Sequence, residues 1–283
     1  MKYLLMIFCF AAALAACRTI DAPTSLRTKC FDASTLTAEE RALADSLLAL
    51  GLDNEALYTL FAPLKPISTV AQFSLALARS DSLPAGIRHA INPNAPELER
   101  LRQYQRIVNA LRSERVELLL IPFRRTDKGK RFFEIVAIDK RLLADIIRRD
   151  QAFWGQWGFV PESNLAVMLT VTEFEEKLDR YRAYGYLFGY PEYAVTFFVE
   201  AAREQDSTKK LVARDFFQIP TYSAKQGRFV YAIPKGHTPS AIDSALYRAA
   251  EQILRRYQSV RARYVGPDGR LRALELLQEN CSP

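Results

Sequence analysis

Apolar and polar positions along the chain first predict two β-hairpins. Nearly unbroken apolar runs cover residues 116–123 and 132–138, and the turn sequence Thr126-Asp127-Lys128-Gly129 lies between them. The second hairpin is predicted from the apolar segments 211–219 and 228–233. Residues 165–171 predict one further strand, whereas residues 69–78 fit a strand or a helix equally well.

Helical spacing and capping signals predict most of the remaining elements. Thr37 with Glu40 three residues later is a capping box, and it predicts a helix that begins at Thr37 and ends at Gly51. A short helix follows from Asp53 and ends at Pro63. Further helices are predicted over 97–112, 140–149, 173–187, 192–205 and 239–264, with a last short one after the turn 266–269. Together these elements predict an α+β fold: a mainly antiparallel sheet with helices packed on it.

The two hairpins resemble each other in sequence. Ile121-Pro122 and Arg131-Phe132 of the first hairpin correspond to Ile219-Pro220 and Arg228-Phe229 of the second, and a strand and a helix follow in each. Two strand–strand–helix units related as a pseudo-repeat would explain the similarity. Chance similarity between two amphipathic hairpins explains it as well.

The first 16 residues have the parts of a secretory signal peptide. A positively charged start, Met1-Lys2-Tyr3, precedes an apolar run over 4–14 and a small-residue exit at Ala15-Ala16. A helix that crosses a bilayer needs about 20 apolar residues. The run is shorter than that, so we expect export from the cytoplasm followed by removal of residues 1–16.

Leu14-Ala15-Ala16-Cys17 resembles the lipobox of bacterial lipoproteins. The resemblance implies that Cys17 receives a diacylglycerol thioether and that cleavage in front of it allows a further acyl chain, such as palmitate, to be added. Two or more acyl chains hold a protein firmly at a membrane. Arg18, rather than Asp, follows the cysteine, which favours the outer over the inner membrane of the cell envelope. The alternative is an ordinary signal peptide that leaves Cys17 as a free thiol.

These boundaries predict a lipidated N-terminus and tether over 17–34 and a globular α+β domain, or two subdomains, over 35–283. Of the four cysteines, Cys9 leaves with the signal peptide and Cys17 is modified. Cys30 and Cys281 then remain in an oxidising compartment, which predicts a disulfide between them. Two free thiols are the alternative.

Composition indicates a folded, basic protein. Hydrophobic residues make up 49% of the chain and charged residues 25%, and the formal net charge is +7. In the cytoplasm such a charge would favour nucleic acid as a partner, but export argues against it. We therefore expect an envelope protein, a wall polymer or an anionic lipid surface as the partner, in addition to the membrane that holds the anchor.

Candidate catalytic residues are few. The chain has two histidines, His89 and His237, and His237 could pair with Asp243 at the start of the long helix, where anions are favoured. The alternative is a surface histidine beside a helix cap. Carboxylate pairs that could act in acid–base chemistry, as in glycoside cleavage, are Glu134 with Asp139 and Glu173 with Glu176. They are equally well explained as solvated charges. Phosphate-loop, zinc-helix and serine-elbow motifs are absent from the sequence, and no cofactor or metal site is predicted.

Two other patterns are candidate binding surfaces. One is the aromatic segment, which could stack on sugar rings or on peptide side chains, or else form a core ridge between helices. It comprises Tyr181, Tyr184, Tyr186, Phe188, Tyr190 and Tyr193. The other is the basic face of the long helix, which could contact anionic head groups or be solvated. It comprises Arg248, Arg255, Arg256 and Arg263, opposite the apolar Ile242, Leu246, Ile253, Tyr257, Val260 and Tyr264.

These observations favour a non-enzymatic, lipid-anchored envelope protein with a binding or scaffolding role. The alternative is an envelope hydrolase that acts on glycan or peptide. A deep cleft that collects His237 and carboxylates would support the hydrolase. A basic or aromatic groove would support binding.

Overall fold

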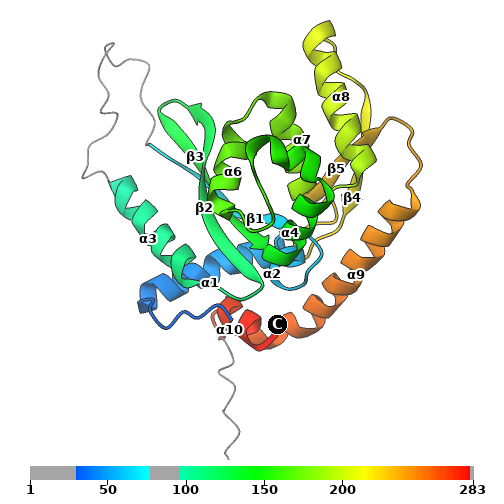
Figure 1. The fold of residues 1–283 in the computed structure, drawn as a ribbon. Helices are drawn as coiled ribbons and strands as arrows, with labels where there is room; N and C mark the ends of the chain where they lie inside the picture. The colour runs from blue at the N-terminus through cyan, green and yellow to red at the C-terminus, as the bar shows by residue number, and fades with distance from the viewer. Residues whose placement is uncertain (1–29, 77–95, 281–283) are drawn as a thin grey trace, which may run out of the picture.

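The structure, a computed structural model, describes residues 30–76 and 96–280 and has an α+β fold (Figure 1). Its strands form one three-stranded and one two-stranded antiparallel sheet, and helices pack against both. The predicted fold class is therefore confirmed. The signal peptide 1–16, Cys17, most of the tether, His89 and Cys281 lie outside the described residues.

The three-stranded sheet is built from the first predicted hairpin and one earlier strand. Its strands are β1 (Ile67–Leu75), β2 (Val116–Asp127) and β3 (Lys130–Asp139), in the order β1-β3-β2. The ambiguous run 69–78 thus contributes a strand. Gln72 of β1 and Ile121 of β2 both pair with Glu134 of the central strand, which fixes the register of the sheet.

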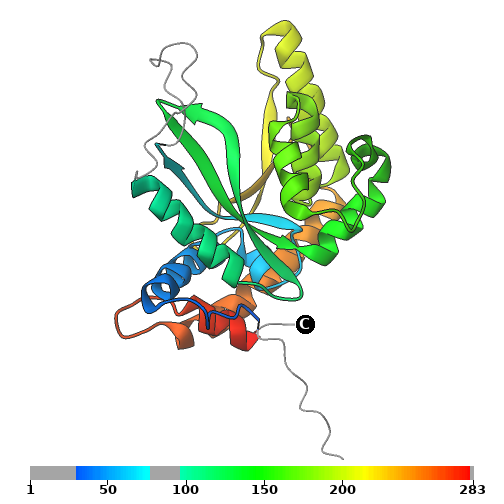
Figure 2. The same ribbon diagram turned by 60° about the vertical axis from the view of Figure 1, so that its left-hand side comes forward.

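Both faces of this sheet are covered by helices, which explains why its strands read as nearly continuous apolar runs. The helices α1 (Ala38–Asp53) and α3 (Pro96–Ala110) cover one face. The other face carries α4 (Lys140–Arg149), α5 (Gln151–Trp154), α6 (Leu165–Phe174) and α7 (Lys177–Leu187). Figure 2 shows α3 and the helices α6 and α7 on opposite sides of the sheet.

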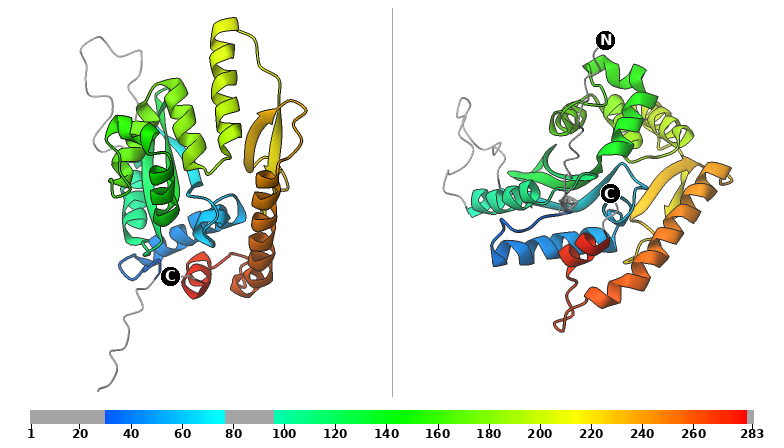
Figure 3. Two further views of the ribbon diagram at one scale, coloured as in Figure 1. Left: turned by 45° about the vertical axis from the view of Figure 1, so that its right-hand side comes forward. Right: turned by 60° about the horizontal axis from the view of Figure 1, so that its bottom comes forward.

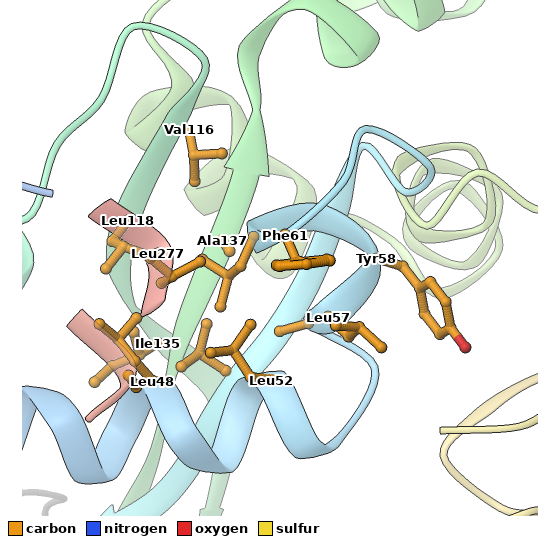
Figure 4. Packing of buried hydrophobic residues seen from close by; sticks show 14 of the residues in the cluster. Leu48, Leu52, Leu57, Tyr58, Phe61, Val116, Leu118, Ile135, Ala137 and Leu277 are labelled. Carbon is orange, nitrogen blue, oxygen red and sulfur yellow. The ribbon is translucent and has the colours of Figure 1, made fainter. Parts of the chain in front are cut away.

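Alternate residues of each strand enter different cores. Leu118, Ile135 and Ala137 pack with Leu48 and Leu52 of α1, and Leu277 lies in the same cluster (Figure 4). The short helix α2 (Leu57–Leu60) closes this core at the end of α1. The side-chain period of two in a strand sends the neighbouring residues to the second core, under α4 to α7.

The second predicted hairpin forms the two-stranded sheet. It comprises β4 (Arg214–Ile219) and β5 (Phe229–Pro234), and α8 (Glu192–Thr208) precedes it. After it, α9 (Ala241–Arg261) lies beside the hairpin, as Figure 3 shows, and the chain continues through η2 (Ala262–Tyr264) to α10 (Ala273–Asn280). The two hairpins of the predicted pseudo-repeat thus lie in different sheets, each followed by a helix, and the pseudo-repeat itself stays a prediction.

The start of α1 agrees with the sequence, but its end does not. Thr37 Oγ1 accepts from the Glu40 amide at 3.2 Å, and Glu40 Oε2 accepts from the Thr37 amide at 3.0 Å, so the capping box is confirmed. Gly51 was expected to end the helix, which continues to Asp53. A Cβ at Gly51 would lie 3.1 Å from Val70, so this glycine serves close packing of α1 on β1.

Residues 165–171 were predicted as a strand, and that prediction is wrong because they begin α6. Asn164 caps the helix by accepting from the Val167 amide at 3.0 Å, and the buried residues recur at a spacing of three to four. An apolar run of this length cannot be assigned from periodicity alone. The predicted single helix 173–187 is likewise wrong, because α6 ends at Phe174 and α7 starts at Lys177.

The folded part includes residues that precede the expected start at residue 35. Phe31 is 1% exposed and belongs to the core with α1 and α10. Its amide donates to Arg112 O at 3.0 Å, and its carbonyl accepts from Gln278 Nε2 at 2.9 Å. No helix within residues 30–76 and 96–280 is long and apolar enough to cross a membrane.

Candidate functional site: an arginine pocket backed by buried carboxylates

A pocket of about 390 Å³ lies between the β2–β3 hairpin and the helices α6 and α7. All three strands of the larger sheet contribute to its wall. The residues that line it are Gln72, Phe123, Arg124, Arg125, Phe132, Glu173 and Arg180.

An irregularity in β2 explains how three consecutive residues reach the same pocket. In a regular strand, neighbouring side chains point to opposite faces. The pairing of β2 with β3 shifts register between Pro122 and Thr126, so the residues 123–125 leave the regular alternation. Proline has no amide hydrogen to donate, which fits the interruption of the ladder at this point.

The arginines of the pocket are held by backbone groups and rings. Arg124 Nη1 donates to Glu175 O at 3.2 Å, and Arg180 Nη1 donates to Glu173 O at 3.4 Å. The guanidinium of Arg125 lies 5.0 Å from the ring centroid of Phe132. Within the part of the chain that the structure describes, none of these three arginines forms an ion pair with a carboxylate side chain.

The charge of the wall favours an anion. Three guanidinium groups face one carboxylate, that of Glu173, and two phenylalanine rings supply apolar surface. Arginine presents several N–H donors in a planar fork that matches carboxylate, phosphate and sulfate groups. The pocket can therefore hold an anionic group and an adjoining apolar portion of one ligand.

Glu173 connects the pocket with a group of buried polar residues. It is 6% exposed, its Oε1 accepts from the Arg124 amide at 2.9 Å, and its Oε2 accepts from the Tyr184 hydroxyl at 2.7 Å. Burial and the neighbouring Glu173 charge raise the pKa of Tyr184 above its ordinary value. The hydroxyl therefore stays protonated and keeps donating to Glu173.

Glu134 lies directly behind the pocket wall. It is 7% exposed, accepts a hydrogen bond from the Thr69 hydroxyl, and is the cross-strand neighbour of Gln72. Burial raises the pKa of Glu134 to about 7; the nearby carboxylates of Glu55 and Glu173 act in the same direction.

A lysine deeper in the protein adds a positive charge to this group. Lys65 is 1% exposed, and its Nζ lies 2.6 Å from Glu55 Oε2. The ammonium also lies 5.0 Å from the ring centroid of Phe188 and 4.3 Å from that of Phe229. A buried charge needs such partners, because an isolated one costs several kcal/mol.

The structure separates both predicted carboxylate pairs. Asp139 forms a buried ion pair with Arg115 at 2.7 Å and caps α4 by accepting from the Leu142 amide at 3.0 Å. It therefore has a structural role away from Glu134. Glu176 is exposed at the start of α7. Glu134 and Glu173, one from each predicted pair, are instead brought together across the interface between the sheet and the helices.

His237 lies near Asp243, as the sequence suggested, but not at the pocket. Its Nε2 is 3.8 Å from Asp243 Oδ2, and its ring stacks on Tyr193 with centroids 4.8 Å apart. Asp243 is fully buried and accepts from the Ser240 amide at 2.6 Å and from the hydroxyls of Tyr193 and Tyr231. Although burial opposes this, those hydrogen bonds lower the pKa of Asp243. Asp243 therefore acts as part of the N-terminal cap of α9.

The candidate aromatic surface is divided among several environments. Tyr184, Phe188 and Tyr190 form a row of ring contacts that ends beside Lys65 in the interior. Tyr186 is buried against Phe153. The remaining two contact other elements: Tyr181 packs on Phe198, and Tyr193 on His237. These side chains therefore serve packing between different elements of the fold.

The candidate basic face of α9 is exposed. Arg248, Arg255 and Arg256 of α9 and Arg263 of the following η2 all lie at the surface. Arg255 pairs with Glu251 at 2.9 Å, and the guanidinium of Arg256 lies 5.0 Å from the ring centroid of Phe61. On the opposite face, Tyr257 and Tyr264 are buried as expected, but Ile242 is 62% exposed and Asp243 is buried in its place.

Cys30 is disulfide-bonded, and its expected partner, Cys281, lies outside the described residues. The next residue, Phe31, accepts from Gln278 of α10, which ends at Asn280. The described ends of the chain thus lie near each other, and the pairing of Cys30 with Cys281 stays a prediction.

Sequence reasoning missed most of the pocket. Arg124, Arg125 and Arg180 read as ordinary surface charges, since Pro122 is compatible with an interrupted strand but does not by itself specify the register shift or the neighbouring helix. One signal was present: Glu134 is a charged residue inside the otherwise apolar run 132–138. A charge in such a position is buried and needs an explanation.

Comparison with known proteins gives no further assignment, since no family model, curated protein or solved structure matches the chain. Among residues 30–76 and 96–280, no group of three or more His, Cys, Asp and Glu side chains is placed to hold a metal ion.

Proposed function

We propose that the chain is a lipid-anchored protein of the bacterial cell envelope that binds an anionic ligand with an apolar portion in the arginine pocket. The composition of the pocket wall carries this proposal: Arg124, Arg125 and Arg180 next to Phe123 and Phe132. Pockets that bind small ligands combine apolar walls with a few convergent polar groups.

The positions of the candidate catalytic residues favour binding over hydrolysis. A hydrolase would need its acid–base groups within reach of a substrate. Glu134 has a pKa suited to a general acid, but it is buried behind the wall, and His237 does not line the pocket. Glu173 reaches the pocket with both oxygens already accepting hydrogen bonds.

Binding is tested with octyl sulfate, which keeps a single negative charge, and with octyl glucoside as a neutral probe of the same chain length. The titration uses the full chain with Cys17→Ser, because this substitution removes the acyl chains that could compete with the probe for the pocket. Octyl sulfate should bind in calorimetric titration below its micelle concentration, and Arg180→Gln should weaken it at least about tenfold, since a hydrogen bond to a charged group contributes about 1.5–3 kcal/mol.

The control is Arg203→Gln, which removes a surface arginine paired with Glu200 on α8. It should leave binding unchanged. Equal binding of octyl glucoside, or no loss in Arg180→Gln, would contradict an anion site at this pocket.

The anchor is tested separately by fractionation of cells. The native protein should sediment with membranes, because two or more acyl chains bind firmly, and Cys17→Ser should release the protein or leave it unprocessed. Recovery of the native protein in the soluble fraction with an unmodified Cys17 would refute the anchor and leave the pocket untouched.

A further inference from the structure

The pocket and Glu134 share a wall. Gln72, which lines the pocket, pairs directly with Glu134 across the two strands. Directly opposed residues in an antiparallel pair have Cβ atoms about 5 Å apart. Phe132, another wall residue, lies two positions before Glu134 on the same face of β3. A charge on Glu134 is therefore one layer of side chains away from a bound ligand.

The groups that surround Glu134 come from every neighbouring element. From β1, Thr69 donates a hydrogen bond to it. The helices contribute Glu173 and Tyr184, and the Glu55–Lys65 ion pair also acts on the charge of Glu134.

Neutralisation within this group is incomplete. Lys65 already forms an ion pair with Glu55, and Tyr184 is uncharged. Within residues 30–76 and 96–280, neither Glu134 nor Glu173 forms an ion pair with a lysine or arginine side chain, and Lys65 acts on Glu134 only from a distance. The side chains of Arg124 and Arg180 line the pocket together with Glu173.

A bound anion would change this balance. In the free protein, the positively charged arginines of the pocket lie in the same wall as Glu173, whose negative charge acts on Glu134. An anion that occupies those arginines offsets their positive charge and adds a negative charge in a partly desolvated site. Both effects disfavour the ionised form of Glu134.

We propose that anion binding in the arginine pocket is coupled to uptake of one proton by Glu134, so that the pocket binds its ligand more tightly in mildly acidic than in mildly alkaline conditions. This inference rests on the proposed function, because it concerns the regulation of the same pocket. The proton comes from solvent and goes to a carboxylate oxygen of Glu134, the residue that titrates near neutral pH.

The direction in which affinity changes with pH follows from the linkage between ligand binding and proton uptake. If the ligand raises the pKa of Glu134 by about one unit, the affinity falls about fivefold between pH 6 and pH 8. Glu134→Gln has the shape of the protonated residue and no charge at any pH. The Glu134→Gln variant should therefore bind octyl sulfate at pH 8 as tightly as the chain with native Glu134 does at pH 6. Its affinity should not change between pH 6 and pH 8.

The test is a titration of the full chain carrying Cys17→Ser with octyl sulfate at pH 6, 7 and 8. The heat is measured in two buffers with different ionisation enthalpies, which gives the number of protons taken up. Near pH 7 we expect uptake of about half a proton, which vanishes in Glu134→Gln. The proton count in the chain with native Glu134 does not depend on whether this variant folds.

The outcomes separate the two proposals. No binding of octyl sulfate at any pH refutes the proposed function. Binding with constant affinity and no proton uptake leaves the pocket in place and overturns the coupling. Proton uptake that persists in Glu134→Gln, with native-like unfolding, assigns the proton to another group and also overturns it.

Discussion

At the scale of residues, Glu134 interrupts an otherwise apolar strand, and its environment could not be derived from the sequence. The spacing of Glu134 and Asp139 on one strand suggested a pair, yet the odd separation sends their side chains in different directions. Glu173 lies near Glu134 because α6 packs on the sheet, and no local sequence pattern specifies that packing. The hydrogen-bonding partners of both carboxylates are likewise distant in sequence.

The stability of the protein should depend on pH through Glu134. Its folded-state pKa of about 7 lies above the ordinary value of 4.5, so the folded state binds more protons than the unfolded state between these values. The contribution of Glu134 to the free energy of unfolding is therefore lost as pH rises from about 4.5 to about 7. Glu134→Gln should raise the free energy of unfolding by about 1–3 kcal/mol at pH 8 and leave it nearly unchanged at pH 4.

Urea denaturation at both pH values measures this effect. The exposed Glu162→Gln is the control, with no difference expected at either pH. A variant that is destabilised at pH 8 would mean that Glu134 is stabilised as an anion.

At the scale of elements, the predictions that rest on a known local interaction, such as a helix cap or a turn, are confirmed. The capping box at Thr37 and the turn at 126–129 both placed an element correctly. The prediction of a strand at 165–171 was wrong because a short apolar segment fits two environments. It can form a helix packed on the sheet or a strand within the sheet. The pocket depends on the shift in β2, which is a property of the paired strands rather than of one segment.

The exposed arginines of α9 provide a test at this scale. Arg248→Gln, Arg255→Gln and Arg263→Gln combined should leave the midpoint of thermal unfolding nearly unchanged, since exposed charges contribute little. Arg256 is retained because it packs on Phe61. If this face contacts anionic head groups, binding of the full chain with Cys17→Ser to anionic liposomes should weaken about 100-fold, at about 1 kcal/mol for each of the three arginines.

The matched control changes the net charge equally at other surface sites, through Arg148→Gln, Arg203→Gln and Arg270→Gln, all exposed. Equal weakening by both sets would show that only net charge matters. A lower unfolding midpoint in the α9 set would contradict the exposed position of these side chains.

At the scale of the whole molecule, one core contains residues from both sheets together with α1, α9 and α10. The beginning and the end of the described chain meet in this core, where Phe31 and Gln278 are hydrogen-bonded. Sequence reasoning predicted the fold class and the proximity of the ends. It did not predict how the two hairpins would be placed, because they lie in separate sheets and are related only through the packing of a shared core.

The predicted disulfide between Cys30 and Cys281 would join these ends. Closing so long a loop stabilises a fold by up to about 5 kcal/mol in the chain-entropy model, although measured values are often smaller. Peptide mapping of unreduced protein by mass spectrometry should recover the linked pair, and reduction should lower the unfolding midpoint. Quantitative labelling of both thiols without reduction would disprove the bond.

The central claim is that an anionic ligand occupies the arginine pocket, and the most direct measurement is the location of a bound ligand. Amide chemical shifts of the full chain with Cys17→Ser, followed during titration with octyl sulfate, report that location. The largest changes should occur at residues 123–125, at Phe132 and at Arg180, which line the pocket. Changes confined to the arginine face of α9, or spread over the surface without saturation, would contradict the claim.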